Sequence, residues 1–160
     1  MPPYTVDGTV VSSTTIREAL ANGEPEKAAA MLSHPYSIET AVTHGKQLGR
    51  TLGFPTANQI FPAMRQIPKY GVYVVRLTSE GKTYKGVANV GLRPTVENSK
   101  TVNAETYLLD YKGDLYGKTV KTEFLRFLRP EMKFADTGEL QKAVRRNIGE
   151  AEKYFEEENK

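Results

Sequence analysis

The fold is decided by the stretch GVYVVRLTSEGKTYKGVANV, which runs from Gly71 to Val90. Two runs rich in β-branched and aromatic residues, 71–78 and 82–90, flank the turn sequence Ser79-Glu80-Gly81. Such runs on either side of a glycine-containing turn predict a β-hairpin. The stretch therefore favours an antiparallel sheet over an alternation of strands and helices.

More strands are predicted on both sides of this hairpin, at residues 37–42, 102–109 and 119–127. Short strands separated by turn residues at this spacing predict an antiparallel barrel or sandwich. Loops are expected at 59–68, where residues 63–67 show no clear periodicity, and at 89–95, which has the turn chemistry of Gly and Pro. A further loop is expected at 129–136, and those at 59–68 and 129–136 have the character of mobile segments.

Helices are predicted at the two ends of the chain. The hydroxyls of residues 12–15 can cap a short helix over 16–20, and Pro25 opens a second over 26–32. The last helix begins at Asp136 or Thr137 and carries an apolar stripe of Leu140, Val144, Ile148 and Ala151. That stripe predicts a structural role, packing against the sheet.

The composition bounds the class of protein. The chain has 160 residues, enough for one domain and a short appendage, and a net charge of +3 with scattered cations. This spread does not favour nucleic acid, which is typically bound by a concentrated basic stripe. There is no cysteine, and two histidines are too few for a histidine-based metal site. No apolar stretch long enough to cross a bilayer is present, so the expected compartment is the cytoplasm.

A glycine-rich segment, GKQLGRTLGFPTAN at 45–58, carries the clearest chemistry. Glycines let backbone N–H groups approach an anion, and Lys46 and Arg50 can neutralise phosphate charge. Thr56 and Asn58 lie two apart, so on a strand their oxygens face the same side and suit a magnesium ion that shares phosphate ligands. The segment has no P-loop pattern. The alternative is a glycine-rich hairpin leading into a strand.

Glu105 is the candidate general base. Alternation along 102–109 places it on one face with Asn103, Tyr107 and Leu109. A carboxylate in mid-strand is costly to bury unless its face is wet or functional. The alternative is an ordinary solvent-exposed glutamate.

A third cluster lies at 124–134, where aromatic, thioether and guanidinium groups gather at the end of a strand. Such groups can cover a planar ring system. The alternative is a strand end followed by a charged turn.

Together these segments resemble the riboflavin kinase domain of the bacterial bifunctional riboflavin kinase/FMN adenylyltransferases. The resemblance spans nearly the whole chain and rests on ordered motifs, of which Pro-Thr-Ala-Asn is the most specific: residues 34–36, 49–58, 71–73, 89–91, 93–95, 105–110, 115–118 and 128–134.

The resemblance implies a mainly β fold, a six-stranded antiparallel Greek-key barrel with a C-terminal helix. It implies an ATP-dependent kinase that phosphorylates the ribityl 5′-hydroxyl of riboflavin to give FMN and ADP, with Mg²⁺. In this family's pattern Glu105 is the base and Thr56 and Asn58 hold the metal. The remaining implied site residues are Gly45, Lys46, Gly49 and Arg50 for ATP, and Arg126, Arg129 and Phe134 for the flavin.

Residues 1–33 resemble the tail of an adenylyltransferase domain, on the strength of the sequence SSTTIR at 12–17. The kinase domain is accordingly expected at 34–160, with an adenylyltransferase domain preceding it in a parent chain. One late motif cannot build a second active site, so no FAD synthesis is expected from this sequence, and a helix cap is the favoured role of 12–17. Two other classes stay open: a non-catalytic flavin- or nucleotide-binding barrel, and an oligonucleotide-binding barrel.

Overall fold

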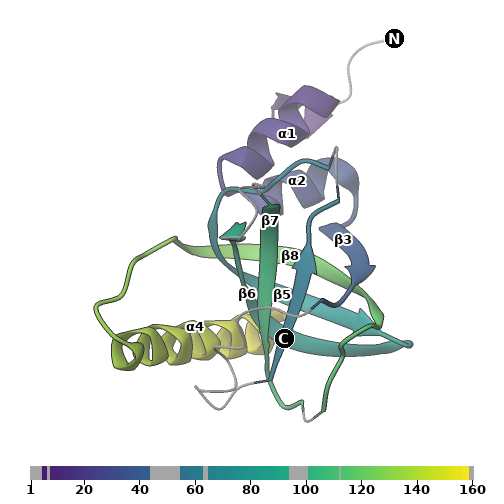
Figure 1. The fold of residues 1–160 in the computed structure, drawn as a ribbon. Coiled ribbons are helices and arrows are strands. Elements are labelled where there is room, and N and C mark those ends of the chain that lie inside the picture. Colours follow the sequence, from purple (N-terminus) through teal and green to yellow (C-terminus); the bar gives the residue numbers. More distant parts are fainter. Residues whose placement is uncertain are drawn as a thin grey trace.

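The computed structural model describes residues 5–6, 8–43, 55–62, 65–93, 101–111 and 113–158. Six strands form one curled sheet, with two short helices at one end and a long helix across it (Figure 1). The elements in chain order are β1 (Thr5–Val6), β2 (Thr9–Val10), α1 (Ser13–Ala21), α2 (Pro25–Leu32), β3 (Tyr36–Ala41), β4 (Thr56–Ile60), β5 (Gly71–Ser79), β6 (Lys82–Arg93), β7 (Thr101–Leu108), β8 (Thr119–Pro130) and α4 (Thr137–Glu158).

The sheet runs in the order β3-β8-β5-β6-β7-β4, and every neighbouring pair is antiparallel. β8 returns to lie beside β5, which is the Greek-key arrangement of four strands. The sheet curls until its two edge strands meet, where Thr43, just after β3, forms an isolated bridge to Asn58 of β4. The predicted antiparallel six-stranded barrel with a C-terminal helix is therefore confirmed.

The inner face of the sheet and the two N-terminal helices share one hydrophobic core. Leu20 of α1 and Met31 of α2 are buried with Tyr73 and Phe124 of the barrel. α1 begins at Ser13, three residues before the predicted start, because Ser12 alone is the cap: its side chain accepts a hydrogen bond from the backbone N–H of Thr15 in a capping box. α1 and α2 therefore plug one end of the barrel.

The loop predicted to begin at residue 59 is wrong at its start. Gln59 belongs to β4 and is fully buried inside the barrel. Its Nε2 donates to the Thr40 carbonyl at 3.3 Å, to Thr40 Oγ1 at 3.0 Å and to the Val120 carbonyl at 3.0 Å. Its Oε1 accepts from the Thr122 hydroxyl. Each of these groups would cost about 1–3 kcal/mol if buried without a partner, so the network stabilises the interior.

The described part of the 59–68 stretch is anchored rather than loose. The Tyr36 hydroxyl donates to the Gln66 carbonyl at 2.6 Å, and the Arg65 guanidinium lies 4.9 Å from the centre of the Tyr36 ring. Residues 89–93 also differ from the sequence prediction, because β6 continues through them to pair with β7.

The outer face of the sheet is covered by α4. Val144, Ala151 and Phe155 of the helix are buried against a patch of β5, β6, β7 and β8. Asp136 is the cap, since its Oδ1 accepts from the Glu139 N–H at 2.8 Å. In the part of the chain that the structure describes, we find no helix with both the length and the apolarity needed to cross a membrane.

Candidate active site

A row of side chains crosses the outer face of the sheet from one side to the other. The strand registers pair Asn58 with Glu105, Glu105 with Asn89, Asn89 with Val72, and Val72 with Arg129. Directly opposed residues in a sheet point to the same face. The row therefore joins the β4 edge to the segment that follows β8.

The β4 end of the row carries neutral oxygens. Asn103 Nδ2 donates a hydrogen bond to Asn58 Oδ1 at 3.1 Å, and Thr56 precedes Asn58 by two positions on the same face. The other end of the Asn103 carboxamide, Oδ1, is buried without a hydrogen-bond partner among the described residues. An acceptor lacking a donor suits a cation, and hydroxyl and carboxamide oxygens are hard ligands. These side chains therefore fit a magnesium ion that takes its other ligands from phosphates.

Glu105 and Tyr107 are neighbours on the same face of β7. Burial raises the pKa of Tyr107, the negative charge of Glu105 and a hydrogen bond between the two side chains raise it further, and Arg129 lowers it. Tyr107 thus stays protonated and can donate to the half-buried Glu105 carboxylate. The predicted division of β7 is confirmed, because Ala104 and Leu108 point inward to the barrel clusters while Tyr107 packs on the α4 side.

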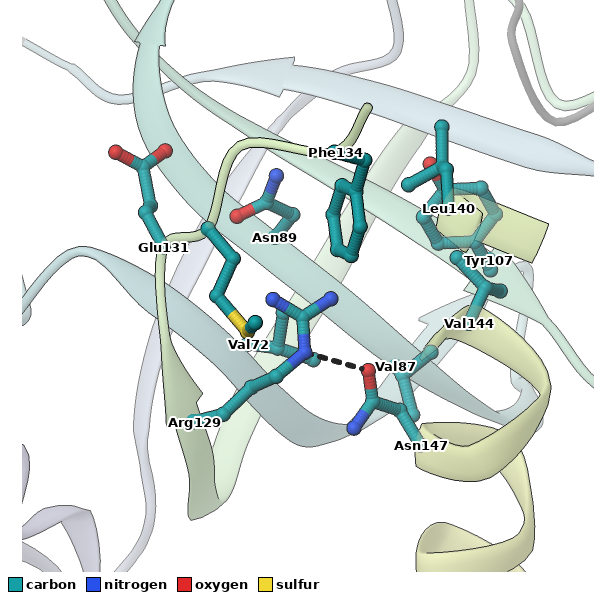
Figure 2. A pocket seen from close by; sticks show the side chains of 11 residues that line it. Val72, Val87, Asn89, Tyr107, Arg129, Glu131, Phe134, Leu140, Val144 and Asn147 are labelled. Carbon is teal, nitrogen blue, oxygen red and sulfur yellow. Dashed lines mark hydrogen bonds between the residues drawn. The ribbon is translucent and has the colours of Figure 1, made fainter. Parts of the chain in front are cut away.

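Arg129 at the β8 end is fixed by α4. Its Nε donates to Asn147 Oδ1 at 3.0 Å (Figure 2), and Asn147 Nδ2 donates in turn to Glu150 Oε1 at 3.1 Å. The guanidinium lies 5.4 Å from the centre of the Phe134 ring. Burial lowers the pKa of Arg129, but a guanidinium remains charged in a protein. Asn147 therefore holds the positively charged Arg129 guanidinium beside the Phe134 ring.

A small cavity of about 50 Å³ lies between this row and α4. It is lined by side chains of the sheet, of α4 and of the segment after β8 (Figure 2): Val72, Val87, Asn89, Tyr107, Arg129, Glu131, Met132, Phe134, Leu140, Val144 and Asn147. An open cleft of about 430 Å³ adjoins it and shares Arg129, Met132, Phe134 and Asn147. Small-molecule sites usually measure about 300–1,000 Å³, so the cleft has the size of a ligand site. The shared side chains stand between the cleft and the cavity.

The segment after β8 rests on the sheet at Gly91. The Glu131 carboxylate fills the space in which a β-carbon on Gly91 would stand. Gly91 pairs with Asn103, two residues along the strands from the Asn89–Glu105 pair, so the contact lies next to that pair on the same face. The segment thus closes over the side of the row that faces α4.

Comparison with known proteins gives the family of this chain. The riboflavin kinase family model matches residues 32–155. The chain belongs to the riboflavin kinase family. Among curated relatives, the bifunctional riboflavin kinase/FMN adenylyltransferase of Escherichia coli strain K12 is 41% identical over 150 residues, which are 92% of this chain and 47% of that protein. The Pseudomonas fluorescens enzyme of the same name is 40% identical over 146 residues, which are 91% and 47%. The chain spans about half the length of the curated relatives it matches.

Solved structures agree on the fold. A Streptococcus pneumoniae chain described as a macrolide-efflux protein superposes with a TM-score of 0.81 at 30% identity, covering 93% of this chain and 49% of that one. Riboflavin kinase from Trypanosoma brucei superposes with a TM-score of 0.52 at 23% identity, covering 76% and 80%. The second likeness is one of fold alone.

The structure brings together several of the residues predicted for a riboflavin kinase site. Thr56, Asn58 and Glu105 share one face, and Arg129 and Phe134 line the cavity at the far end of the same row. Arg126 does not line the cavity or the cleft. It lies 4.7 Å from the centre of the Tyr154 ring and 4.0 Å from Glu26, so its role with the flavin stays a prediction. The predicted ATP residues Gly45, Lys46, Gly49 and Arg50 lie outside the described residues.

Sequence reasoning missed Tyr107 and Asn147 as members of this site. For Asn147 a signal was present: it follows Val144 by three and precedes Ala151 by four, so a polar residue stands on the apolar face of the last helix. Tyr107 carried a weaker signal, being two residues from Glu105 on the same strand face.

Proposed function

We propose that this chain transfers the γ-phosphoryl group of ATP to the ribityl 5′-hydroxyl of riboflavin, giving FMN and ADP. The observation that carries the proposal is the row itself, which places a carboxylate between neutral metal-type oxygens on one side and a cleft of ligand size on the other. Membership of the riboflavin kinase family supports the same reaction.

Glu105 accepts the proton of the 5′-hydroxyl as that oxygen forms its bond to the γ-phosphorus and the bond from phosphorus to the ADP oxygen breaks. Tyr107, by donating to Glu105, orients the carboxylate for this task. General-base assistance of this kind contributes about 10²–10⁴-fold to the rate.

Thr56 and Asn58 would hold Mg²⁺, which when bound supplies positive charge that offsets the negative charge of the phosphates. Arg129 and Phe134, with the cleft beside them, bind the planar ring system of the flavin, so that its ribityl chain points along the row towards Glu105. In the longer protein we infer a preceding adenylyltransferase domain, from the names of the curated relatives.

The test is a product assay with the purified chain, riboflavin, ATP and magnesium, in which riboflavin, FMN and FAD are separated by chromatography. FMN should form, chelation of the metal should abolish it, and FAD should not appear. If riboflavin and ATP bind and no FMN forms, the chain is a non-catalytic flavin- and nucleotide-binding barrel.

A further inference from the structure

Gln59 stands directly after Asn58 on β4 and points the opposite way, into the barrel. Its side chain is fully buried and makes four hydrogen bonds, to three residues that belong to β3 and β8. A leucine would fill a similar volume without any of these bonds. The hydrogen bonds of the Gln59 side chain therefore fix its orientation relative to β3 and β8, which apolar packing alone would not do.

Among the described residues, β4 is paired along its length at one edge, so a second link helps to hold its orientation. Five successive residues of β4 pair with β7. At the other edge, the backbone contact in the described part of the chain is the bridge at Thr43, whose N–H donates to the Asn58 carbonyl at 2.7 Å. Gln59 adds side-chain bonds from the next residue to Thr40 of β3 and to Val120 and Thr122 of β8.

We propose that Gln59 is a positioning residue for the oxygens of Thr56 and Asn58, acting by tying β4 to β3 and β8 through the barrel interior. The inference rests on the proposed function, which assigns those oxygens to the metal and nucleotide. Because successive strand residues face opposite sides, a rotation of β4 about its axis that releases Gln59 also turns Asn58 away from Glu105. The interior network thereby sets the outer-face geometry.

The experiment compares Gln59→Leu, Thr40→Val and the double variant Gln59→Leu/Thr122→Val with the wild type. Calorimetry measures the Kd of ADP with magnesium, fluorescence quenching measures the Kd of riboflavin, and initial rates give KM for ATP. Gln59→Leu should raise the Kd of magnesium-ADP and the KM for ATP by about tenfold, the lower end of effects seen when a residue supporting metal ligands is lost. The riboflavin Kd should stay within about twofold of its wild-type value, because Arg129 and α4 lie at the far end of the row.

Thr40→Val removes one acceptor, Thr40 Oγ1, and should change nucleotide affinity in the same direction by less. It also keeps the proposal testable if Gln59→Leu does not fold. Val75→Ala is the matched control, since Val75 is a fully buried barrel residue on β5. It should lower Tm without changing the Kd of magnesium-ADP.

The double variant separates positioning from packing, because it replaces both a donor and an acceptor by apolar groups. Recovery of Tm with nucleotide affinity still weakened supports the proposal. Recovery of both overturns it, as does a Gln59→Leu protein that binds magnesium-ADP like the wild type. If the wild type forms no FMN, the proposed function fails, and the magnesium-ADP titrations still decide the role of Gln59.

Discussion

The inner and outer faces of the curled sheet both carry polar side chains, but they use them differently. Inside, Gln59 and Thr122 bond to each other and to neighbouring strands, so their polar atoms are consumed by the fold. Outside, Asn58, Glu105 and Asn89 stand in a row beside a cavity, and Asn103 keeps an acceptor that no described residue satisfies. In this comparison the inner Gln59–Thr122 pair serves stability, while the outer row carries oxygens that stand beside a cavity and can take part in chemistry.

The largest effect is expected from Glu105→Gln on the outer face. It should lower kcat for FMN formation by about 10²–10⁴-fold, because the proposed base is lost, and leave Tm nearly unchanged. Initial rates at saturating substrates and a thermal melt measure the two quantities. Glu39→Gln, at an exposed position of β3, is the control and should have wild-type kcat. Near-normal turnover of Glu105→Gln would show that Glu105 is not the general base.

Gly71→Ala tests the strand contact on which both faces depend. Gly71 has φ +151°, and a β-carbon there would meet the Arg129 carbonyl and come within 2.7 Å of the Phe127 ring. We expect the free energy of unfolding to fall by about 3 kcal/mol, measured by urea titration.

Gly149→Ala on α4 is the matched glycine control, since nothing lies within 4 Å of the position that a β-carbon would take there. It should raise the free energy of unfolding by about 0.5–1 kcal/mol. Equal effects at the two positions would mean that the close approach of β5 and β8 does not fix the sheet.

Asn147→Leu sharpens the comparison at the end of the outer face where we propose that the flavin binds. Without the Asn147 acceptor, Arg129 loses the contact that holds it beside the cavity, and a hydrogen bond to a charged group is worth about 1.5–3 kcal/mol. The KM for riboflavin should rise by about tenfold or more, while the KM for ATP stays unchanged. Gln141→Leu, on the same helix but not in the cavity lining, is the control. An equal rise in both KM values would contradict a flavin-specific role.

The smallest effect is expected from an inner-face group, Tyr73. Burial raises the pKa of Tyr73 above its ordinary value of 10.0, so the folded chain keeps a proton that the unfolded chain releases. Stability from this group is therefore full below about pH 10 and falls as pH rises further, by at most about 1.4 kcal/mol per pH unit. Urea titrations at pH 8, 9.5 and 10.5 should show the fall, and Tyr73→Phe should show less of it.

The same Tyr73→Phe variant should keep the wild-type KM for riboflavin and for ATP at pH 8, because its side chain faces the interior. A changed KM would show that the inner face reaches the site by routes other than Gln59. A pH dependence of unfolding as steep as that of the wild type would remove Tyr73 as its source.

The longer strands and the helices were predictable because each carries its own local pattern, whereas the two-residue strands β1 and β2 were not predicted. Alternation along β7 separated Glu105 from Ala104, and the hydroxyls at 12–15 marked the start of α1. The pairing of Asn58 with Glu105 was not predictable from pattern alone, because it depends on β4 lying next to β7, a contact between segments far apart in the chain. Thr56, Asn58 and Glu105 were named from residue type and strand spacing and then supported by a family resemblance, and the strand register places them on one face.

The errors came from polar residues whose surroundings are set by tertiary contacts. Gln59 looked like the start of a loop because a glutamine on a buried strand has no local signature, and only Thr40, Val120 and Thr122 explain it. Residues 89–93 looked like a turn because of Gly91, yet that glycine serves the close approach of Glu131 within a continuing strand. The domain boundary predicted between residues 33 and 34 stays a prediction.

The plug formed by α1 and α2 bears on how this domain of the riboflavin kinase family can be exchanged between proteins. The family match begins at residue 32, but Leu20, Ala28 and Met31 already lie in the barrel core. A recombination breakpoint at residue 32 would uncover that end of the core, and each large apolar side chain left in water forfeits about 1.5–3 kcal/mol. A transplanted domain that keeps the barrel core intact must therefore include the chain from Ser12 onward. The start of α1 is accordingly the better position for a recombination breakpoint.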